Sequence, residues 1–207
     1  MRYYSLIGIP IITLLITACT LQPIAPEAAV KQNQVPTEQP TDSSQTNSEL
    51  IKPQNVTDLE SIYGPPSQAA FGSAAFYEQM KSETSLEQMA LAQYKYFVGD
   101  LWERYGEEAW MGSWKEVYAR PADVTHDIVA ELRTISDPDA ALSVPMILDN
   151  IDNAENARSA LSAVYDNAAT TEVRVFNLGD GGTMSGILVA GRRQATGEAI
   201  LLVFLLD

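Results

Sequence analysis

Apolar residues recur at helical spacing through the middle of the chain. Between Thr84 and Gly106 they follow one another at steps of three or four residues, so they share one helix face. The segment Thr84-Ser85-Leu86-Glu87 has the spacing of a capping box, which predicts where this helix begins, and Gly106 is expected to end it. The face consists of Leu86, Ala90, Tyr94, Phe97, Leu101 and Tyr105.

Weaker patterns of the same kind predict shorter helices on either side. In the helix predicted over 121–135, Val124 begins a buried stripe that continues at steps of four and three residues. Pro145 is expected to interrupt any long helix around it, because proline lacks the N–H that a helix interior needs. The predicted helices are 74–81, 107–119, 121–135 and 154–165, with a single capped turn from Thr57 and a short segment over 146–151.

After residue 170 the hydrophobic period changes from 3.6 to 2, which is typical of strands. Three strands are expected, over 171–178, 183–190 and 199–206, with a hairpin turn at the sequence GDGG (179–182). The last strand, AILLVFLL, is apolar on both faces and must be covered on both. It lies inside the sheet, or helices cover two faces, or a second copy of the chain covers it.

These patterns predict an α+β fold, with a helical N-terminal half packed on a C-terminal antiparallel sheet of about three strands. The expected globular domain is 57–207, and a domain of this length needs no disulfide or metal to fold. The preceding segment, 19–56, is rich in Pro, Gln, Ser and Thr and has no aromatic residue, so we expect a disordered tether.

The first eighteen residues have the plan of a secretory signal peptide: a basic start at Arg2, an apolar stretch over 6–18, and small residues at its end. A membrane-spanning helix is disfavoured, because the apolar stretch over 6–18 is shorter than the roughly 20 residues needed to cross a bilayer core. Ile16-Thr17-Ala18-Cys19 resembles the lipobox of bacterial lipoproteins. The resemblance implies cleavage before Cys19 and a lipid anchor on its thiol; an ordinary signal peptide with an incidental cysteine is the alternative.

Cys19 is the only cysteine, so a thiol exported from the cytoplasm would have no partner for an internal disulfide. Lipidation accounts for it, since two or more acyl chains give stable membrane anchoring. The resemblance therefore implies an extracytoplasmic, lipid-anchored protein of a bacterial cell envelope. Thr20 rather than Asp follows the cysteine, which favours the outer membrane in bacteria that have one.

The formal charge of −14 becomes −15 when cleavage removes Arg2, one of the thirteen basic residues. Nucleic acids and anionic lipid surfaces would be repelled by such a chain, so we expect no nucleic-acid partner. A cationic partner or solubility alone accounts better for the acidic composition.

No set of residues predicts a catalytic, cofactor or metal site. The single histidine, His126, is expected to point to solvent on its helix, and no G-x-S-x-G turn occurs. Asp137 and Asp152 stand where helix N-caps belong rather than in a calcium loop. GDGG precedes a strand instead of a helix, so it does not fit a phosphate-binding loop.

Eight of the seventeen aromatic residues fall between Tyr94 and Tyr118. Tyr96 and Trp102 lie off the main helix stripe and are candidates for a surface that binds an envelope protein or a small ligand. Arg192 and Arg193, the only adjacent basic pair, either contact a carboxylate at such a surface or mark an exposed loop tip.

The favoured function is a noncatalytic binding or interaction module. The alternative is a small hydrolase or carbohydrate-active enzyme with an acid and base pair drawn from Asp100, Glu107 and Glu108 beside the aromatic helices. A homodimer through the last strand, 199–206, is a third hypothesis.

Overall fold

One antiparallel sheet of five strands organises the part of the chain that the computed structural model describes, residues 51–122 and 124–207. The strand order is β1-β5-β4-β3-β2, so the last strand of the chain lies between the first and the fourth. The strands are β1 (Gly72–Gln79), β2 (Lys115–Ala119), β3 (Glu172–Gly179), β4 (Ser185–Arg193) and β5 (Glu198–Leu206).

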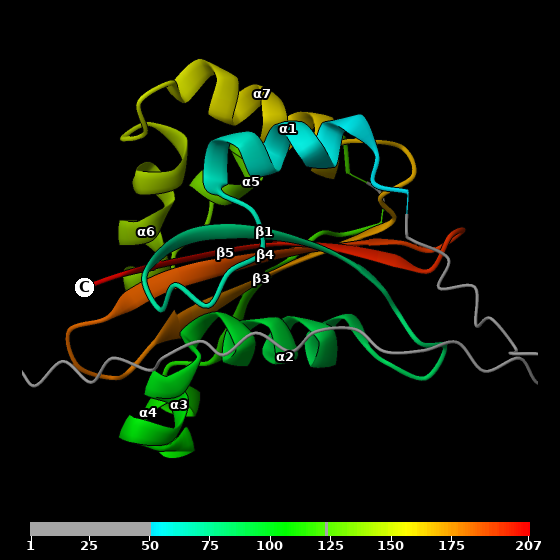
Figure 1. Ribbon diagram of the computed structural model, residues 1–207. Helices are drawn as coiled ribbons and strands as arrows, with labels where there is room; N and C mark the ends of the chain where they lie inside the picture. Colours follow the sequence, from blue (N-terminus) through cyan, green and yellow to red (C-terminus); the bar gives the residue numbers. More distant parts are fainter. Residues whose placement is uncertain (1–50, 123) are drawn as a thin grey trace, which may run out of the picture. The chain divides into compact units, whose positions relative to one another are not determined.

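Helices cover both faces of the sheet (Figure 1). Three of them lie against one face: α2 (Leu86–Val98), α3 (Asp100–Tyr105) and α4 (Glu107–Gly112). The other face carries α1 (Gln54–Tyr63), α5 (Ile128–Arg133), α6 (Pro138–Leu148) and α7 (Ala154–Tyr165). Within the described residues, no helix combines the length and the apolar character that crossing a membrane requires.

The two helical layers explain the sequence of β5. Its residues alternate between two hydrophobic cores: Leu202 packs with α1 and α5–α7, and Leu201 packs with α2–α4. Both of its edges are hydrogen-bonded, to β1 and to β4. The strand therefore lies inside the sheet and helices also cover both of its faces, so two of the three expected explanations hold together. It has no free edge with which to pair a second copy of the chain.

The α+β class is confirmed, but the expected division into a helical half and a three-stranded half is wrong. The sequence pattern predicts a helix over 74–81, yet 72–79 form β1, which pairs with β5. The hydroxyl of Ser73, in β1, donates to the carbonyl of Tyr63. The second half of the predicted helix 107–119 is β2. Pairing with distant strands decides both segments, because each is too short for its local pattern to do so.

Several helix boundaries also differ from the prediction. The capping-box segment at Thr57 lies inside α1, which begins at Gln54, so the predicted tether ends earlier than Val56. Val56 itself is fully buried. The predicted helix over 121–135 is limited to α5, and Val124 is 40 % exposed rather than part of a buried stripe.

Pro145 lies inside α6 instead of ending it. By contrast, α7 spans the residues predicted for it, and GDGG forms the β3–β4 turn as expected. The predicted signal peptide 1–18, the lipobox with Cys19 and the tether up to residue 50 lie outside the described residues.

Candidate functional site

A pocket of about 390 Å³ lies where α2 meets α3, and it brings together two of the residues singled out from the sequence, Tyr96 and Trp102. One of the predicted carboxylates, Asp100, also lines it. We call this site the α2–α3 pocket. Its walls are Gln68, Ala92, Lys95, Tyr96, Gly99, Asp100, Trp102 and Glu103.

Gly99 creates the pocket by separating the two helices. Its φ of 59° and ψ of −133° are accessible to glycine and strongly disfavoured for other residues, so the helix predicted as one element from 84 to 106 breaks here. The loop before β1 contains a residue with a strained backbone, Ala70. Ala70 has a φ of 64°, and its N–H donates to the carbonyl of Phe97 at 2.9 Å. This bond ties the loop before β1 to the C-terminal turn of α2.

Trp102 forms the floor of the pocket and is part of the core. Its side chain is only 4 % exposed, and its ring packs edge-on against Tyr94 at 5.4 Å and stacks with Trp110 at 6.2 Å. The prediction that Trp102 is an exposed contact residue is therefore wrong: it is off the main stripe of α2 because it belongs to a second, short helix. Its indole N–H is buried and has no hydrogen-bond partner within the described residues.

The rim of the pocket is exposed. Tyr96 is 46 % exposed, and its ring meets the edge of Phe76 at 6.0 Å. Lys95 reaches over the pocket floor, with its Nζ atom 5.6 Å from the centroid of the Trp102 ring. Phe71, which follows the strained Ala70, is 65 % exposed. Phe71 does not line the pocket, but the bond from Ala70 to Phe97 holds its backbone near the end of α2.

Arg192 and Arg193 do not line the α2–α3 pocket, and they are not an exposed loop tip. Both belong to the end of β4. Arg193 is 8 % exposed and lies 3.8 Å from the carboxylate of Glu198, while Arg192 lies 3.8 Å from that of Glu172. Each arginine therefore lies near a carboxylate of a neighbouring strand of the same chain.

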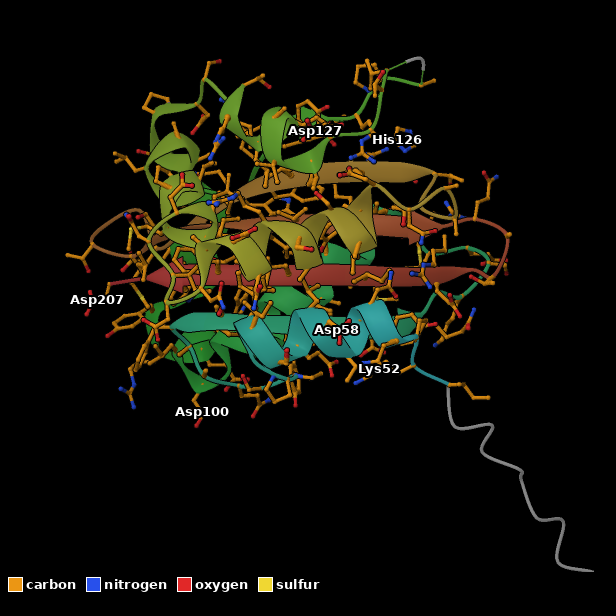
Figure 2. All side chains as sticks on the ribbon, turned by 90° about the horizontal axis from the view of Figure 1, so that it is seen from above. Lys52, Asp58, Asp100, His126, Asp127 and Asp207 are labelled. Carbon is orange, nitrogen blue, oxygen red and sulfur yellow. The ribbon has the colours of Figure 1, made fainter. Side chains whose placement is uncertain are left out.

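The candidate catalytic residues do not converge. Asp100 lies on the open rim of the α2–α3 pocket, and Glu107 and Glu108 are exposed at the start of α4 without lining it. His126 is exposed as predicted, and it lies on the opposite side of the molecule from Asp100 in the view of Figure 2.

The carboxylates considered for calcium have other roles. Asp137 is the N-cap of α6, as predicted, and it also forms an ion pair with Lys115 at 3.2 Å. The N-cap of α7 is Asn153 and not Asp152. The described residues contain no group of three His, Cys, Asp or Glu side chains placed to hold a metal ion. In the β3–β4 turn, Asp180 accepts from two backbone N–H groups of its own loop, which fits a hairpin.

A second cavity, of about 200 Å³, lies beside this turn. Asn177 lines it with its side chain 5 % exposed; the amide Nδ2 donates to the carbonyl of Ser113 at 3.3 Å, and its Oδ1 has no partner within the described residues. This oxygen is itself covered, so a ligand in the cavity does not reach it without a change in Asn177. The cavity is smaller and more polar than the α2–α3 pocket, and it contains no aromatic ring.

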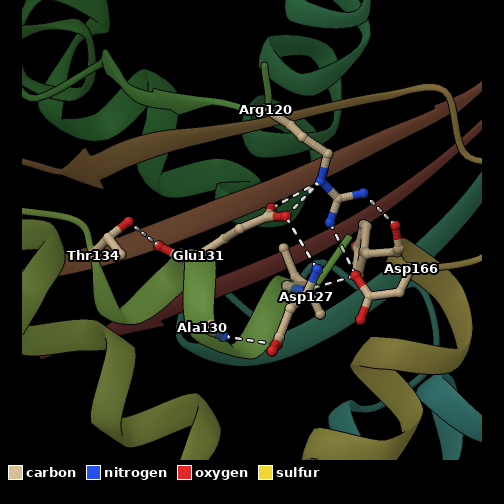
Figure 3. A network of polar contacts seen from close by, with 8 residues as sticks. Arg120, Asp127, Ala130, Glu131, Thr134 and Asp166 are labelled. Atoms are coloured by element: carbon tan, nitrogen blue, oxygen red, sulfur yellow. Dashed lines mark hydrogen bonds and ion pairs between the residues drawn. The ribbon is translucent and has the colours of Figure 1, made fainter. Parts of the chain in front are cut away.

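Residues far apart in the chain form a polar network around Arg120 that no local sequence pattern indicates (Figure 3). The Arg120 side chain, 3 % exposed, donates from Nε to both oxygens of Glu131 at 2.8 and 2.9 Å. It also donates to the carbonyl of Tyr165 at 2.6 Å and to Asp166 at 3.0 Å. The carboxylates receive further bonds from the N–H groups of Asp127 and Ile128. The guanidinium and both carboxylates are hydrogen-bonded to one another and to the backbone, so the network joins the end of β2 to α5 and to the end of α7.

Comparison with known proteins gives no relative from which a function could be transferred: no family model, no curated protein and no solved structure matches this chain.

Proposed function

We propose that this chain is a lipid-anchored lipoprotein of a bacterial cell envelope whose globular unit is a noncatalytic binding module. The anchoring part of the proposal rests on the resemblance of Ile16-Thr17-Ala18-Cys19 to a lipobox. The acidic composition disfavours nucleic acid as a partner. An envelope protein or a small ligand then remains as the partner, outside the cytoplasm and on the outer membrane where one exists.

The binding part of the proposal rests on the α2–α3 pocket. A buried aromatic floor and an exposed aromatic rim are the elements that binding surfaces use most, because rings bury a large area with little loss of conformational entropy. Trp102 supplies the floor and Tyr96 the rim. The pocket is open, and its carboxylates stand on its wall rather than around an enclosed reaction centre.

Capture of partners from detergent-solubilised envelope tests the proposal with the full-length chain. Tyr96→Ala removes the exposed ring at the pocket rim. Tyr105→Ala is the matched control, because Tyr105 is 56 % exposed and does not line the pocket. We expect the wild type and Tyr105→Ala to retain the same partner and Tyr96→Ala to lose it. Identical capture by all three chains would contradict the assignment of this pocket.

An enzymatic alternative remains attached to the same site, because Asp100 and Glu103 both line it beside aromatic rings. A carboxylate pair next to rings is the arrangement of many carbohydrate-active enzymes. Turnover of a glycoside or ester substrate by the wild type, lost in both Asp100→Asn and Glu103→Gln, would replace the binding proposal with this one.

A further inference from the structure

We propose that the α2–α3 pocket binds a basic side chain of a partner polypeptide, and that Lys95 occupies the position of that side chain in the free chain. The inference rests on the binding function proposed above and names the chemistry of the partner. The ammonium of Lys95 lies 5.6 Å from the centroid of the Trp102 ring. This is within the distance of about 6 Å at which the face of an indole attracts a cation.

Lys95 holds this position weakly. Its side chain is exposed, and no ion pair in the described part of the chain includes it. An exposed cation–π contact changes an equilibrium only roughly two- to five-fold. A second cation that brings additional contacts can therefore displace Lys95 into solvent at little cost.

The charges around the ring favour a cation once Lys95 has moved. Asp100 and Glu103 are the other charged residues that line the pocket, and both are acidic. With Lys95 turned outward, two carboxylates and two aromatic rings remain at the site. The formal charge of −14 on the whole chain attracts a cationic partner from a distance as well.

One feature favours a polypeptide over a small free cation. Apolar surface extends past the pocket to Phe71, which is 65 % exposed and does not line the pocket. The bond from Ala70 N–H to Phe97 O holds Phe71 close to the end of α2. A small cation would not use this outer surface.

The test titrates ¹⁵N-labelled protein with a pentapeptide that carries one central lysine between alanine and glycine residues. The protein has three tryptophans, and the indole signal of Trp102 is the one missing from Trp102→Phe. We expect the lysine peptide and its arginine counterpart to shift this signal in a saturable way. The same peptide with norleucine in place of lysine should leave it unchanged, because only the cation differs.

Exposed substitutions then test the roles of the charges. Lys95→Met removes the resident cation and should tighten binding of the lysine peptide roughly two- to five-fold. Asp100→Asn with Glu103→Gln should weaken binding. Asp58→Asn with Glu87→Gln removes the same charge from exposed sites outside the pocket and should leave the affinity nearly unchanged.

The proposal is overturned if the norleucine peptide binds as well as the lysine peptide, if Lys95→Met weakens binding, or if the two double variants behave alike. Equal binding of tetramethylammonium would overturn the choice of a polypeptide. If envelope capture depends on Tyr96 but the lysine peptide neither binds nor competes, the binding function stands and this inference fails. If the lysine peptide binds and no envelope component is captured, the proposed function fails instead.

Discussion

Replacing Arg120 with methionine should destabilise the protein more than any other single loss of charge in the described residues. Methionine keeps much of the length of the side chain but removes its donors. The guanidinium is 3 % exposed and makes bonds of 2.8 Å to Glu131 and 3.0 Å to Asp166, whose side chains are 10 % and 17 % exposed. The variant leaves two carboxylates, both largely buried, without their counter-charge.

Removing one partner of a buried ion pair costs about 3–5 kcal/mol, because the remaining charge stays desolvated. Arg133→Met is the matched control. Arg133 also binds a carboxylate at 3.0 Å, that of Asp149, but the two side chains are 53 % and 42 % exposed. Exposed pairs contribute about 0–1 kcal/mol. The structure therefore predicts that Arg120→Met lowers the free energy of unfolding several times more than Arg133→Met, although the two substitutions are of the same chemical type.

Urea unfolding followed by tryptophan fluorescence measures both variants in the unit Asn47–Asp207, which contains both hydrophobic cores. A loss of about 4 kcal/mol lowers the midpoint by about 2 M when the dependence on urea is about 2 kcal/mol per M. Arg120→Met with Glu131→Met should cost less than the sum of the two single changes by about 1–3 kcal/mol, since the residues contact each other. Equal losses in Arg120→Met and Arg133→Met would refute the reasoning.

Three further outcomes follow from single sites. Burial acts to raise the pKa of Asp137, but hydrogen bonds from two helix N–H groups and from Lys115 lower it below the ordinary value of 3.8. Asp137 should therefore stabilise the protein relative to Asp137→Asn above about pH 3.8, and this difference should disappear as the pH falls through the folded-state pKa. Urea unfolding at a series of pH values measures it. Tyr94→Phe leaves the N–H of Gly179, bound to the Tyr94 hydroxyl at 3.1 Å, without its acceptor, and should cost about 1–3 kcal/mol in thermal or urea unfolding. Mass spectrometry of the mature N-terminus should find a diacylglycerol on Cys19; a free thiol or an uncleaved leader would exclude the proposed anchor.

Local sequence predicted the elements whose neighbours lie close in the chain. Helix α7 has its own N-cap and a clear apolar stripe, and β3, β4 and β5 form a meander whose turns are short. Each of these elements is specified by residues within about ten positions. The α+β class followed from them, because the period of the pattern changes where the meander begins.

The remaining elements depend on distant pairing. The sequence GSAAFYEQ forms β1 because β5, more than 120 residues later, supplies its hydrogen-bond partners. KEVYA forms β2 because β3 pairs with it. The partners of Arg120 lie 11 and 46 residues away, so no spacing rule reveals them. Two further strands and the network joining β2, α5 and α7 could not be read from one local segment.

The candidate site was half predictable for the same reason. The clustering of aromatic residues indicated where a contact surface should be, and Tyr96 is exposed there. One continuous helix over 84–106 would place Trp102 on the same exposed surface. The break at Gly99 rotates the following turn, so Trp102 faces the core and becomes the floor of the pocket.

This division of roles determines which substitutions are informative about binding. Trp102 packs against Tyr94 and Trp110, so its truncation would remove core contacts and change stability together with any affinity. Lys95 and Tyr96 project from the last turns of α2 with exposed side chains, and substitutions there should leave the free energy of unfolding within about 0.5 kcal/mol. A change in affinity at Lys95 or Tyr96, with unfolding unaltered, can then be attributed to the site itself. A stable floor beneath an exposed rim thus separates folding from recognition at this pocket.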